Sequence, residues 1–347
     1  MLYQTENRHG GDIYGGIALD FSANVSPLGT PRSVTDAIER ALPELYRYPD
    51  PYCRTLVQTI SEYEGVPKNF VLCGNGASEL IYAYCGAARP KRAMELAPTF
   101  SEYSLALRRT GCEVVRFALK QEENFDLREN FLPILAREKI DALFLCNPNN
   151  PTGTYVPIGE LEAFADTLPE DVLLVMDEAY MEFATEPDCC SMVDYMKAHP
   201  EKPILVLRTF SKYYAMAGLR VGYALGSEEL IGIMRKCSAS WNLNVCAQKA
   251  AVAGLADQEY YQAQKAKIVE GREYLEKEMA ALGCRVYPSQ SNFIYFDTGK
   301  DPAWIQEQLM EKGIRIGAFE MSRVSVGTME ECKLYIKALK EILEAAE

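Results

Sequence analysis

The segment from Thr209 to Arg220 (TFSKYYAMAGLR) combines residue types that could hold a phosphorylated aldehyde. Lys212 stands among hydroxyl-bearing residues, and Arg220 follows eight positions later. A lysine amine forms a Schiff base with an aldehyde, while hydroxyls and a guanidinium bind a phosphate through charge-assisted hydrogen bonds. This is the chemistry that pyridoxal phosphate (PLP) requires. An isolated Ser-Lys pair would carry no such weight, because most lysines are simply solvated at the surface.

Two further segments place polar residues directly after apolar runs that are typical of buried strands. Asp177 follows the run 171–176 (DVLLVM), and Asn150 lies in the segment 147–153 (NPNNPTG) after the run 142–146 (ALFLC). Parallel strands present ligands at their carboxyl ends, where an aspartate could pair with the protonated pyridine nitrogen of PLP. On its own, Asp177 could equally cap a helix, and the segment 147–153 could be only a turn.

Taken together, these motifs resemble those of the fold-type I PLP enzymes of the class I and II aminotransferase family. The Asn-Pro-Thr-Gly, Asp-Glu-Ala-Tyr and Ser-Lys...Gly-Leu-Arg motifs stand in the family's order, and the resemblance covers nearly the whole chain. It implies that Lys212 is the catalytic lysine and that Asp177 pairs with the ring nitrogen. The other cofactor contacts that it implies are Asn150 and Tyr180 for the ring's phenolic oxygen, and Thr209, Ser211 and Arg220 for the phosphate.

The resemblance also assigns two segments on the N-terminal side. The family's phosphate cradle corresponds to Gly76, Ala77 and Ser78, where backbone amides of a helix start would favour an anion; the glycines alone would indicate only a tight turn. The ring that stacks on the cofactor corresponds to an aromatic residue of APTFSEY. We expect Tyr103, with Phe100 as the alternative, although either ring could simply fill the core.

Two implied contacts lie nearer the ends of the chain. Tyr48, in the segment YRYPD, matches a tyrosine that reaches the phosphate of the neighbouring subunit, which implies a homodimer. Arg323, in SRVSVGT, matches the arginine that binds the substrate α-carboxylate, a planar acceptor suited to a guanidinium fork. A lone strand arginine could otherwise form an exposed ion pair.

The composition is that of an acidic globular protein. The 347 residues are 48% apolar with a net charge of -13, which fits about two domains and argues against a nucleic-acid surface. We expect neither a secretory signal nor a membrane span, since no apolar run approaches the roughly 20 residues required. Eleven cysteines without a Cys-x-x-Cys pair indicate reduced thiols in the cytoplasm, and two histidines disfavour a histidine-rich metal centre.

The order of apolar and amphipathic runs predicts an α/β fold. Strand-like runs alternate with helical segments in the middle of the chain, which predicts a mostly parallel sheet covered on both faces; the resemblance implies seven strands. Later, a long helix (258–282), several strands and a final helix (329–345) predict a smaller α+β domain. The predicted strands are 92–96, 113–117, 142–146, 172–176 and 204–207. The predicted domains are an arm (1–35) that packs with the small domain, a large PLP-binding domain (36–245) and a small domain (246–347).

The reaction depends on which bond at the substrate Cα lies perpendicular to the cofactor ring. If it is Cα–H, Lys212 can take the proton and transamination follows; if it is the bond to the carboxylate, CO2 leaves. The segments RHGGDI and LDFSANVSPLG resemble threonine-phosphate decarboxylases, which implies His9 and Asn24 as substrate contacts, although residues 9–11 could be a flexible tail. We therefore expect decarboxylation of O-phospho-L-threonine. The alternative is an aminotransferase of the histidinol-phosphate type or of another specificity.

One position departs from both of these subfamilies. Their arginine that contacts the substrate phosphate corresponds here to Gly317, and the loop after it is short. Arg315 lies two positions earlier, which within one strand is the same face. Arg315 could therefore substitute, or the substrate could lack a phosphate.

Two other classes of protein fit parts of the sequence. A dehydrogenase of the Rossmann type shares the alternating pattern, but no Gly-x-Gly-x-x-Gly follows the first strand. A PLP-binding regulator without activity would share the fold, but the chain retains Lys212, Asp177 and Arg323. We therefore predict an enzyme that acts on a small amino acid or amino-phosphate.

Overall fold

The computed structural model describes residues 10–11, 17–126, 132–187 and 189–346. Its largest element is a seven-stranded sheet in the order β2-β8-β7-β6-β5-β3-β4, in which only β8 is antiparallel to its neighbours. The predicted α/β class and the mostly parallel sheet are confirmed. The strands are β2 (Val71–Gly74), β3 (Arg92–Ala97), β4 (Glu113–Ala118), β5 (Ala142–Cys146), β6 (Leu173–Asp177), β7 (Ile204–Thr209) and β8 (Gly222–Gly226).

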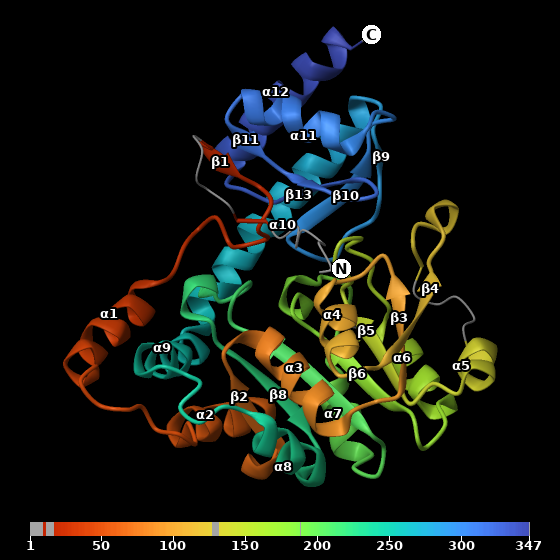
Figure 1. Ribbon diagram of the computed structural model, residues 1–347. Helices are drawn as coiled ribbons and strands as arrows, with labels where there is room; N and C mark the ends of the chain where they lie inside the picture. Colours follow the sequence, from red (N-terminus) through yellow and green to blue (C-terminus); the bar gives the residue numbers. More distant parts are fainter. Residues whose placement is uncertain (1–9, 12–16, 127–131, 188, 347) are drawn as a thin grey trace, which may run out of the picture.

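Helices cover both faces of this sheet, because its central strands are apolar on both sides. β5, β7 and β8 are buried at every residue. One face packs on α3 (Gly76–Ala88), α4 (Glu102–Arg109) and α8 (Glu228–Cys237). The other face packs on α2 (Arg54–Glu64), α5 (Leu132–Glu138), α6 (Ile158–Thr167) and α7 (Met192–Ala198) (Figure 1).

A second, antiparallel sheet lies beyond the carboxyl ends of the parallel strands (Figure 1). It has the order β12-β13-β10-β9 and consists of β9 (Arg285–Val286), β10 (Phe293–Asp297), β12 (Gly317–Ala318) and β13 (Ser322–Ser325). Its helices are α10 (Gln258–Ala281), α11 (Pro302–Glu311) and α12 (Met329–Ala345), close to the predicted bounds. Within the described ranges, none of the helices has the length and apolar character that crossing a membrane takes.

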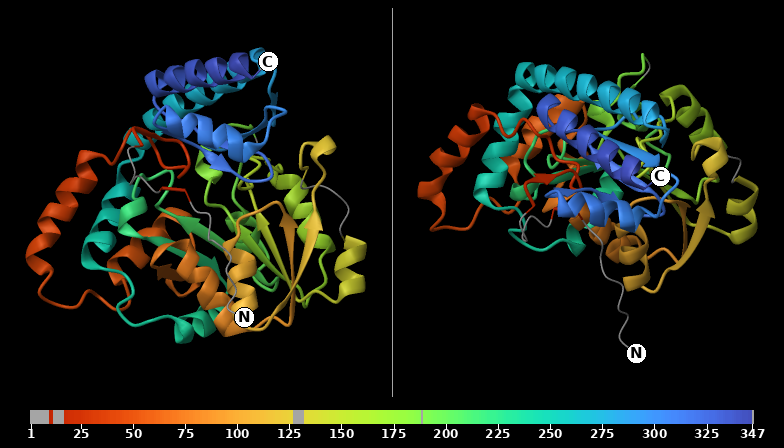
Figure 2. Two further views of the ribbon diagram at one scale, coloured as in Figure 1. Left: turned by 45° about the horizontal axis from the view of Figure 1, so that its top comes forward. Right: turned by 90° about the horizontal axis from the view of Figure 1, so that it is seen from above.

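The N-terminal part connects the two sheets. β1 (Leu19–Asp20) pairs with β11 (Ile314–Arg315) in the C-terminal region. The chain then runs to α1 (Arg32–Ala41), which packs on α9 (Val245–Ala256) beside the large sheet (Figure 2). The predicted domain bounds at 35 and 245 stay a prediction.

Arg315 and Gly317 lie in different sheets, which corrects the expectation that one strand carries both. Arg315 is aligned with Asp20 in the β1–β11 pair, whereas Gly317 is aligned with Arg323 in the β12–β13 pair. The chain passes from one sheet to the other at the buried Ile316. Side chains two residues apart share a face only within one continuous strand. Arg315 therefore does not occupy the position of an arginine at 317.

Candidate active site

The Lys212 side chain is half-buried just beyond the carboxyl end of β7, which ends at Thr209. Its Nζ donates a hydrogen bond to the backbone oxygen of Ala23 at 2.8 Å. Burial, reinforced by the nearby cations Arg323 and Arg220, lowers the pKa of Lys212 to about 7, and Asp177 opposes this shift. A large fraction of the amine is therefore neutral and nucleophilic near neutral pH.

Asp177 ends β6 and is almost completely buried. Its Oδ2 accepts a hydrogen bond from the Tyr103 hydroxyl at 2.6 Å, and its Oδ1 accepts one from the Ala179 backbone N–H at 3.0 Å. Burial raises the pKa of the Asp177 carboxyl, and these two hydrogen bonds oppose the rise. Each carboxylate oxygen keeps a lone pair, so Asp177 can accept a further N–H donor.

Tyr103 has a different contact from the one that we expected. It is completely buried, with its hydroxyl on Asp177 and its ring 5.2 Å from that of Phe144. A ring without exposed surface does not offer a face to a ligand in the cleft. The geometry therefore favours the half-buried Phe100 as the stacking ring and makes Tyr103 a residue that orients Asp177.

The predicted phosphate-binding residues lie together around Arg220. Its Nη1 donates to Ser211 Oγ at 3.2 Å, and the Ser211 backbone N–H donates to Thr209 Oγ1 at 3.1 Å. Gly76 has a φ of +81°, and a Cβ there would lie 2.5 Å from the Arg220 Nη2, so this position requires glycine. A helix start, a guanidinium and hydroxyls together have the donors that binding a phosphate requires. The residues brought together are Gly76, Ala77, Ser78, Thr209, Ser211 and Arg220.

Arg323 is a buried guanidinium whose contacts within the described part of the chain include no carboxylate. Its Nη1 donates to Asn150 Oδ1, its Nη2 donates to the backbone oxygen of Ser22 at 2.7 Å, and its Nε has no partner. Its carbon Cζ lies 4.8 Å from the ring centre of Phe319 and 5.3 Å from that of Phe293. Burial lowers the pKa of Arg323 to about 10. Because an unpaired buried charge is costly, the site is suited to an anionic ligand.

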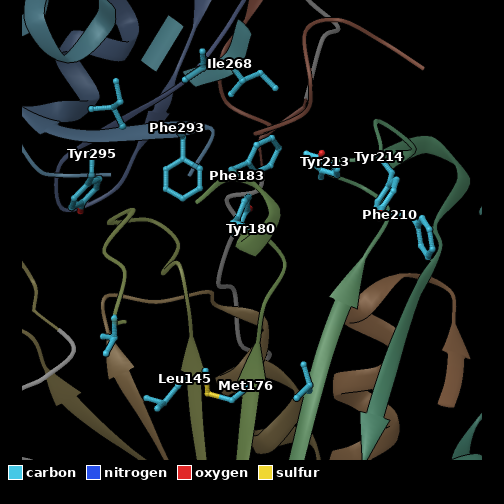
Figure 3. Close-up of a cluster of buried hydrophobic side chains, with 14 of the residues drawn as sticks. Leu145, Met176, Tyr180, Phe183, Phe210, Tyr213, Tyr214, Ile268, Phe293 and Tyr295 are labelled. Atoms are coloured by element: carbon cyan, nitrogen blue, oxygen red, sulfur yellow. The ribbon is translucent and has the colours of Figure 1, made fainter. Parts of the chain in front are cut away.

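Asn150 and Tyr180 each keep one hydrogen-bond donor for a ligand. Asn150 uses its Oδ1 on Arg323, which leaves its Nδ2. The Tyr180 oxygen accepts from Asn24 Nδ2 at 3.3 Å, which leaves the phenolic proton, and burial raises the pKa of Tyr180 so that this proton is retained. Two donors of this kind suit one anionic ring oxygen. Figure 3 shows Tyr180 facing Phe293 of the antiparallel sheet, with ring centres 5.0 Å apart.

The segment 22–24 crosses the site and includes the predicted Asn24, together with contacts that the sequence did not reveal. Asn24 Oδ1 accepts a hydrogen bond from Ser325 Oγ at 2.8 Å, and the Asn24 backbone oxygen accepts one from Asn292 Nδ2 at 3.0 Å. Ser325 could have been found, because it follows Arg323 by two residues and so shares its strand face. The backbone oxygens of Ser22 and Ala23 had no sequence signal, since every residue carries one.

Two predicted site residues lie away from this cluster, and a third lies outside the described residues. Tyr48 is 75% exposed and stacks on Trp241, with ring centres 4.6 Å apart. Arg315 belongs to the separate β1–β11 pair. His9 lies outside the described residues.

A buried ion cluster supports the two strand ends from behind. Arg208, which precedes Thr209, lies 3.1 Å from a carboxylate oxygen of Glu178 and 2.9 Å from one of Glu182. Glu178 also accepts from Ser191 Oγ and from the Met192 N–H, which ties it to the start of α7. The cluster therefore joins β7, which leads to Lys212, to the segment after Asp177.

Comparison with known proteins agrees with this geometry. The family model described as aminotransferase class I and II matches residues 17–339. Histidinol-phosphate aminotransferases of Moorella thermoacetica and of a Geobacillus species are 32% and 34% identical, over 94% of this chain and 85% and 90% of theirs. The crystal structure of histidinol-phosphate aminotransferase from Sinorhizobium meliloti, in complex with pyridoxal-5'-phosphate, has a TM-score of 0.87 at 28% identity, over 95% of this chain and 92% of that one.

L-threonine-O-3-phosphate decarboxylase from Porphyromonas gingivalis shares the fold, with a TM-score of 0.83 at 24% identity over 94% of this chain and 99% of that one. The fold and the site thus define a PLP-dependent enzyme of fold type I. The buried Asp177, the hydroxyls and guanidinium around Arg220 and the lowered pKa of Lys212 fit that cofactor. The chain belongs to the class I and II aminotransferase family.

The lowered pKa of Lys212 predicts how cofactor-free protein reacts with an aldehyde. Only the neutral amine attacks, so the rate should rise through about pH 7 and level off above it, whereas an ordinary lysine would keep gaining rate to about pH 10. Stopped-flow absorbance with pyridoxal, which lacks a titrating phosphate, measures this rate. Arg323→Met should move the midpoint to higher pH because a neighbouring cation is removed, and the surface variant Arg285→Met should not. A rate that still rises above pH 9 in the wild type would refute the assignment.

The ion cluster predicts a large stability cost for losing its cation. Arg208→Met leaves the Glu178 and Glu182 carboxylates without their counter-ion and should lower the free energy of unfolding by about 3 kcal/mol. Lys340→Met, which breaks an exposed pair with Glu344, should cost less than about 1 kcal/mol. Urea denaturation followed by circular dichroism compares the two variants. Equal losses would mean that Arg208 is not an essential counter-ion.

Proposed function

We propose that this protein is an aminotransferase of the histidinol-phosphate aminotransferase type, which passes the amino group of a primary amine to a 2-oxo acid. The observation that carries the proposal is the convergence of a buried lysine, a buried carboxylate and a buried guanidinium at one edge of the sheet. Relatives above 30% identity over 94% of the chain support it, since they are named for amino transfer.

Each residue has a distinct task in this proposal. PLP, when bound, supplies an electron sink that labilises a bond at the substrate Cα. Asp177 would hold the proton on the ring nitrogen, with Tyr103 and the Ala179 N–H fixing the orientation of its carboxylate. Lys212 would be the residue that holds the cofactor and the base that moves the proton at the substrate Cα; its pKa of about 7 suits proton transfer in both directions.

Binding and orientation come from the residues around this centre. Arg323 grips the acidic group of the donor or of the 2-oxo acid, and its contact with Asn150 links that grip to the ring oxygen. The neutral backbone oxygens of Ser22 and Ala23 hold Arg323 and Lys212 in place until charged ligands replace them. The phosphate site around Arg220 anchors the far end of the cofactor.

Amino transfer replaces the decarboxylation that we expected from the N-terminal segments. That expectation depended on residues 8–29, part of which lies outside the described structure. The decarboxylase neighbour, at 24% identity, is evidence for the fold alone. The N-terminal resemblance still makes CO2 release the outcome against which amino transfer must be tested.

Parallel assays of the PLP-loaded protein decide between the two reactions. Amino acids or histidinol phosphate with 2-oxoglutarate should give glutamate, and O-phospho-L-threonine alone should give no CO2. Lys212→Ala should lose the visible absorbance band and lower turnover by 10²–10⁴-fold or more, on the order of a lost general base. Lys265→Ala is the matched control, because Lys265 is another partly buried lysine of lowered pKa, outside the site. CO2 without glutamate would establish the decarboxylase instead.

The proposal includes a homodimer in which Tyr48 reaches the partner's phosphate site. Large hydrophobic side chains are exposed in the segment around it, a feature of protein interfaces. They are Leu42, Leu45, Tyr46, Tyr48 and Tyr52.

Each of the eleven cysteines is a free thiol, which fits the reducing cytoplasm as the location.

Mixing two variants tests the dimer. At a PLP concentration too low to load Tyr48→Phe, this variant should have little activity alone because its cofactor binding is weakened, and Lys212→Ala should lower turnover by 10²–10⁴-fold or more. Unfolding and refolding them together should restore roughly a quarter of the wild-type sites, because each mixed dimer has one complete site. Sedimentation velocity confirms the dimer, and refolding each variant alone is the control. No restored activity would place Tyr48 outside the partner's site.

A further inference from the structure

One face of the antiparallel sheet forms the wall of the active site opposite the cofactor residues. Tyr295, Arg323 and Gly317 are aligned across β10, β13 and β12. Residues directly opposite one another in antiparallel strands point to the same face. The aligned residues therefore present, in order, a phenol, a guanidinium and no side chain at all.

The missing side chain at Gly317 is compensated by Phe319. A Cβ on Gly317 would lie 2.6 Å from the ring atom Cε2 of Phe319, so the ring occupies the space that a side chain at 317 would need. The same ring lies 4.8 Å from the Arg323 Cζ. Phe319 remains 39% exposed. It therefore contacts Arg323 and still has surface on which a ligand could pack.

The charges near this ring do not suit a second anion. The Arg323 guanidinium already donates to Asn150 and to the Ser22 oxygen, which leaves too few N–H donors for more than one acidic group. Glu320, directly after Phe319, is exposed, and its negative charge helps to raise the pKa of Tyr295. A phosphate dianion beside Phe319 would meet an apolar ring and a carboxylate, and both disfavour it.

We propose that Phe319 forms the wall of the donor's side-chain subsite and that this subsite takes an uncharged, apolar side chain rather than a phosphate. The inference rests on the proposed amino transfer and names the donor class for it. The donor is then an amino acid whose carboxylate pairs with Arg323 and whose apolar side chain lies on Phe319. In this respect the chain differs from relatives named for a phosphorylated donor.

A matched pair of unreactive ligands tests the subsite without relying on turnover. 3-Phenylpropionate and 3-phosphonopropionate share a carboxylate and a two-carbon spacer and differ only in the terminal group. Isothermal titration calorimetry of the PLP-loaded wild type should show tighter binding of 3-phenylpropionate. In Phe319→Ala that affinity should fall on the order of tenfold, with a smaller change for the phosphonate. Phe319→Leu, which keeps an apolar wall, should retain most of the affinity.

A second variant reverses the preference if the geometry is right. Gly317→Arg combined with Phe319→Ala removes the ring that blocks position 317 and places a cation opposite Arg323, so 3-phosphonopropionate should become the tighter ligand. Met310→Ala, an exposed apolar residue of α11, is the control and should change neither affinity. Tighter phosphonate binding by the wild type, or an equal loss of both ligands in Phe319→Ala, would overturn the proposal.

Turnover separates this inference from the proposed function. With 2-oxoglutarate, the wild-type kcat/KM should be higher for L-phenylalanine than for histidinol phosphate. Phe319→Ala should lower the ratio of kcat/KM for L-phenylalanine to that for L-alanine by about tenfold. If histidinol phosphate is the better donor, amino transfer stands and the apolar subsite is wrong. If only CO2 forms, amino transfer is wrong, and the ligand pair still tests Phe319.

Discussion

The active site is organised around an excess of positive charge in a buried place. Lys212, Arg220 and Arg323 converge on one edge of the large sheet, and the carboxylate that the described residues place among them is Asp177. Burial is unfavourable for the charged forms of Lys212 and Arg323, and the effect is visible in the lowered pKa of both, whereas Arg220 is exposed. In the proposed function, a carboxylate at Arg323 relieves that cost and a phosphate binds at Arg220.

The two sheets make this arrangement possible by facing one another. The parallel sheet carries Asp177 at the end of β6 and leads to Lys212 after β7, and the antiparallel sheet carries Arg323 on β13. The two sheets lie one above the other in Figure 1. Between them, the backbone oxygens of Ser22 and Ala23 accept hydrogen bonds from Arg323 and Lys212. The ion cluster of Arg208, Glu178 and Glu182 fixes the strand ends from behind.

The cofactor end and the donor end of the site follow different rules. At the cofactor end, backbone conformation restricts the sequence, since Gly76 has a φ of +81° that favours glycine. At the proposed donor end, the ring of Phe319 occupies the space that a side chain at 317 would need, and it also contacts Arg323.

The sequence by itself determined the class of fold and most of the cofactor site. Apolar runs such as 142–146 became central strands because a sheet buried on both faces needs residues that are apolar throughout. Lys212, Asp177 and Arg220 could be assigned because their chemistry and their order along the chain are distinctive.

The tertiary structure decided what depends on contacts between distant segments. In the structure Tyr103 is fully buried and contacts Asp177, whereas we expected its ring to stack on the cofactor. The burial of an aromatic ring depends on packing that no local sequence pattern encodes. The tertiary structure separated Arg315 from Gly317, because the change of sheet at Ile316 interrupts strand alternation. It also brought the oxygens of Ser22 and Ala23 to Arg323 and Lys212, since a backbone group identical in every residue acquires a role only through its position in space.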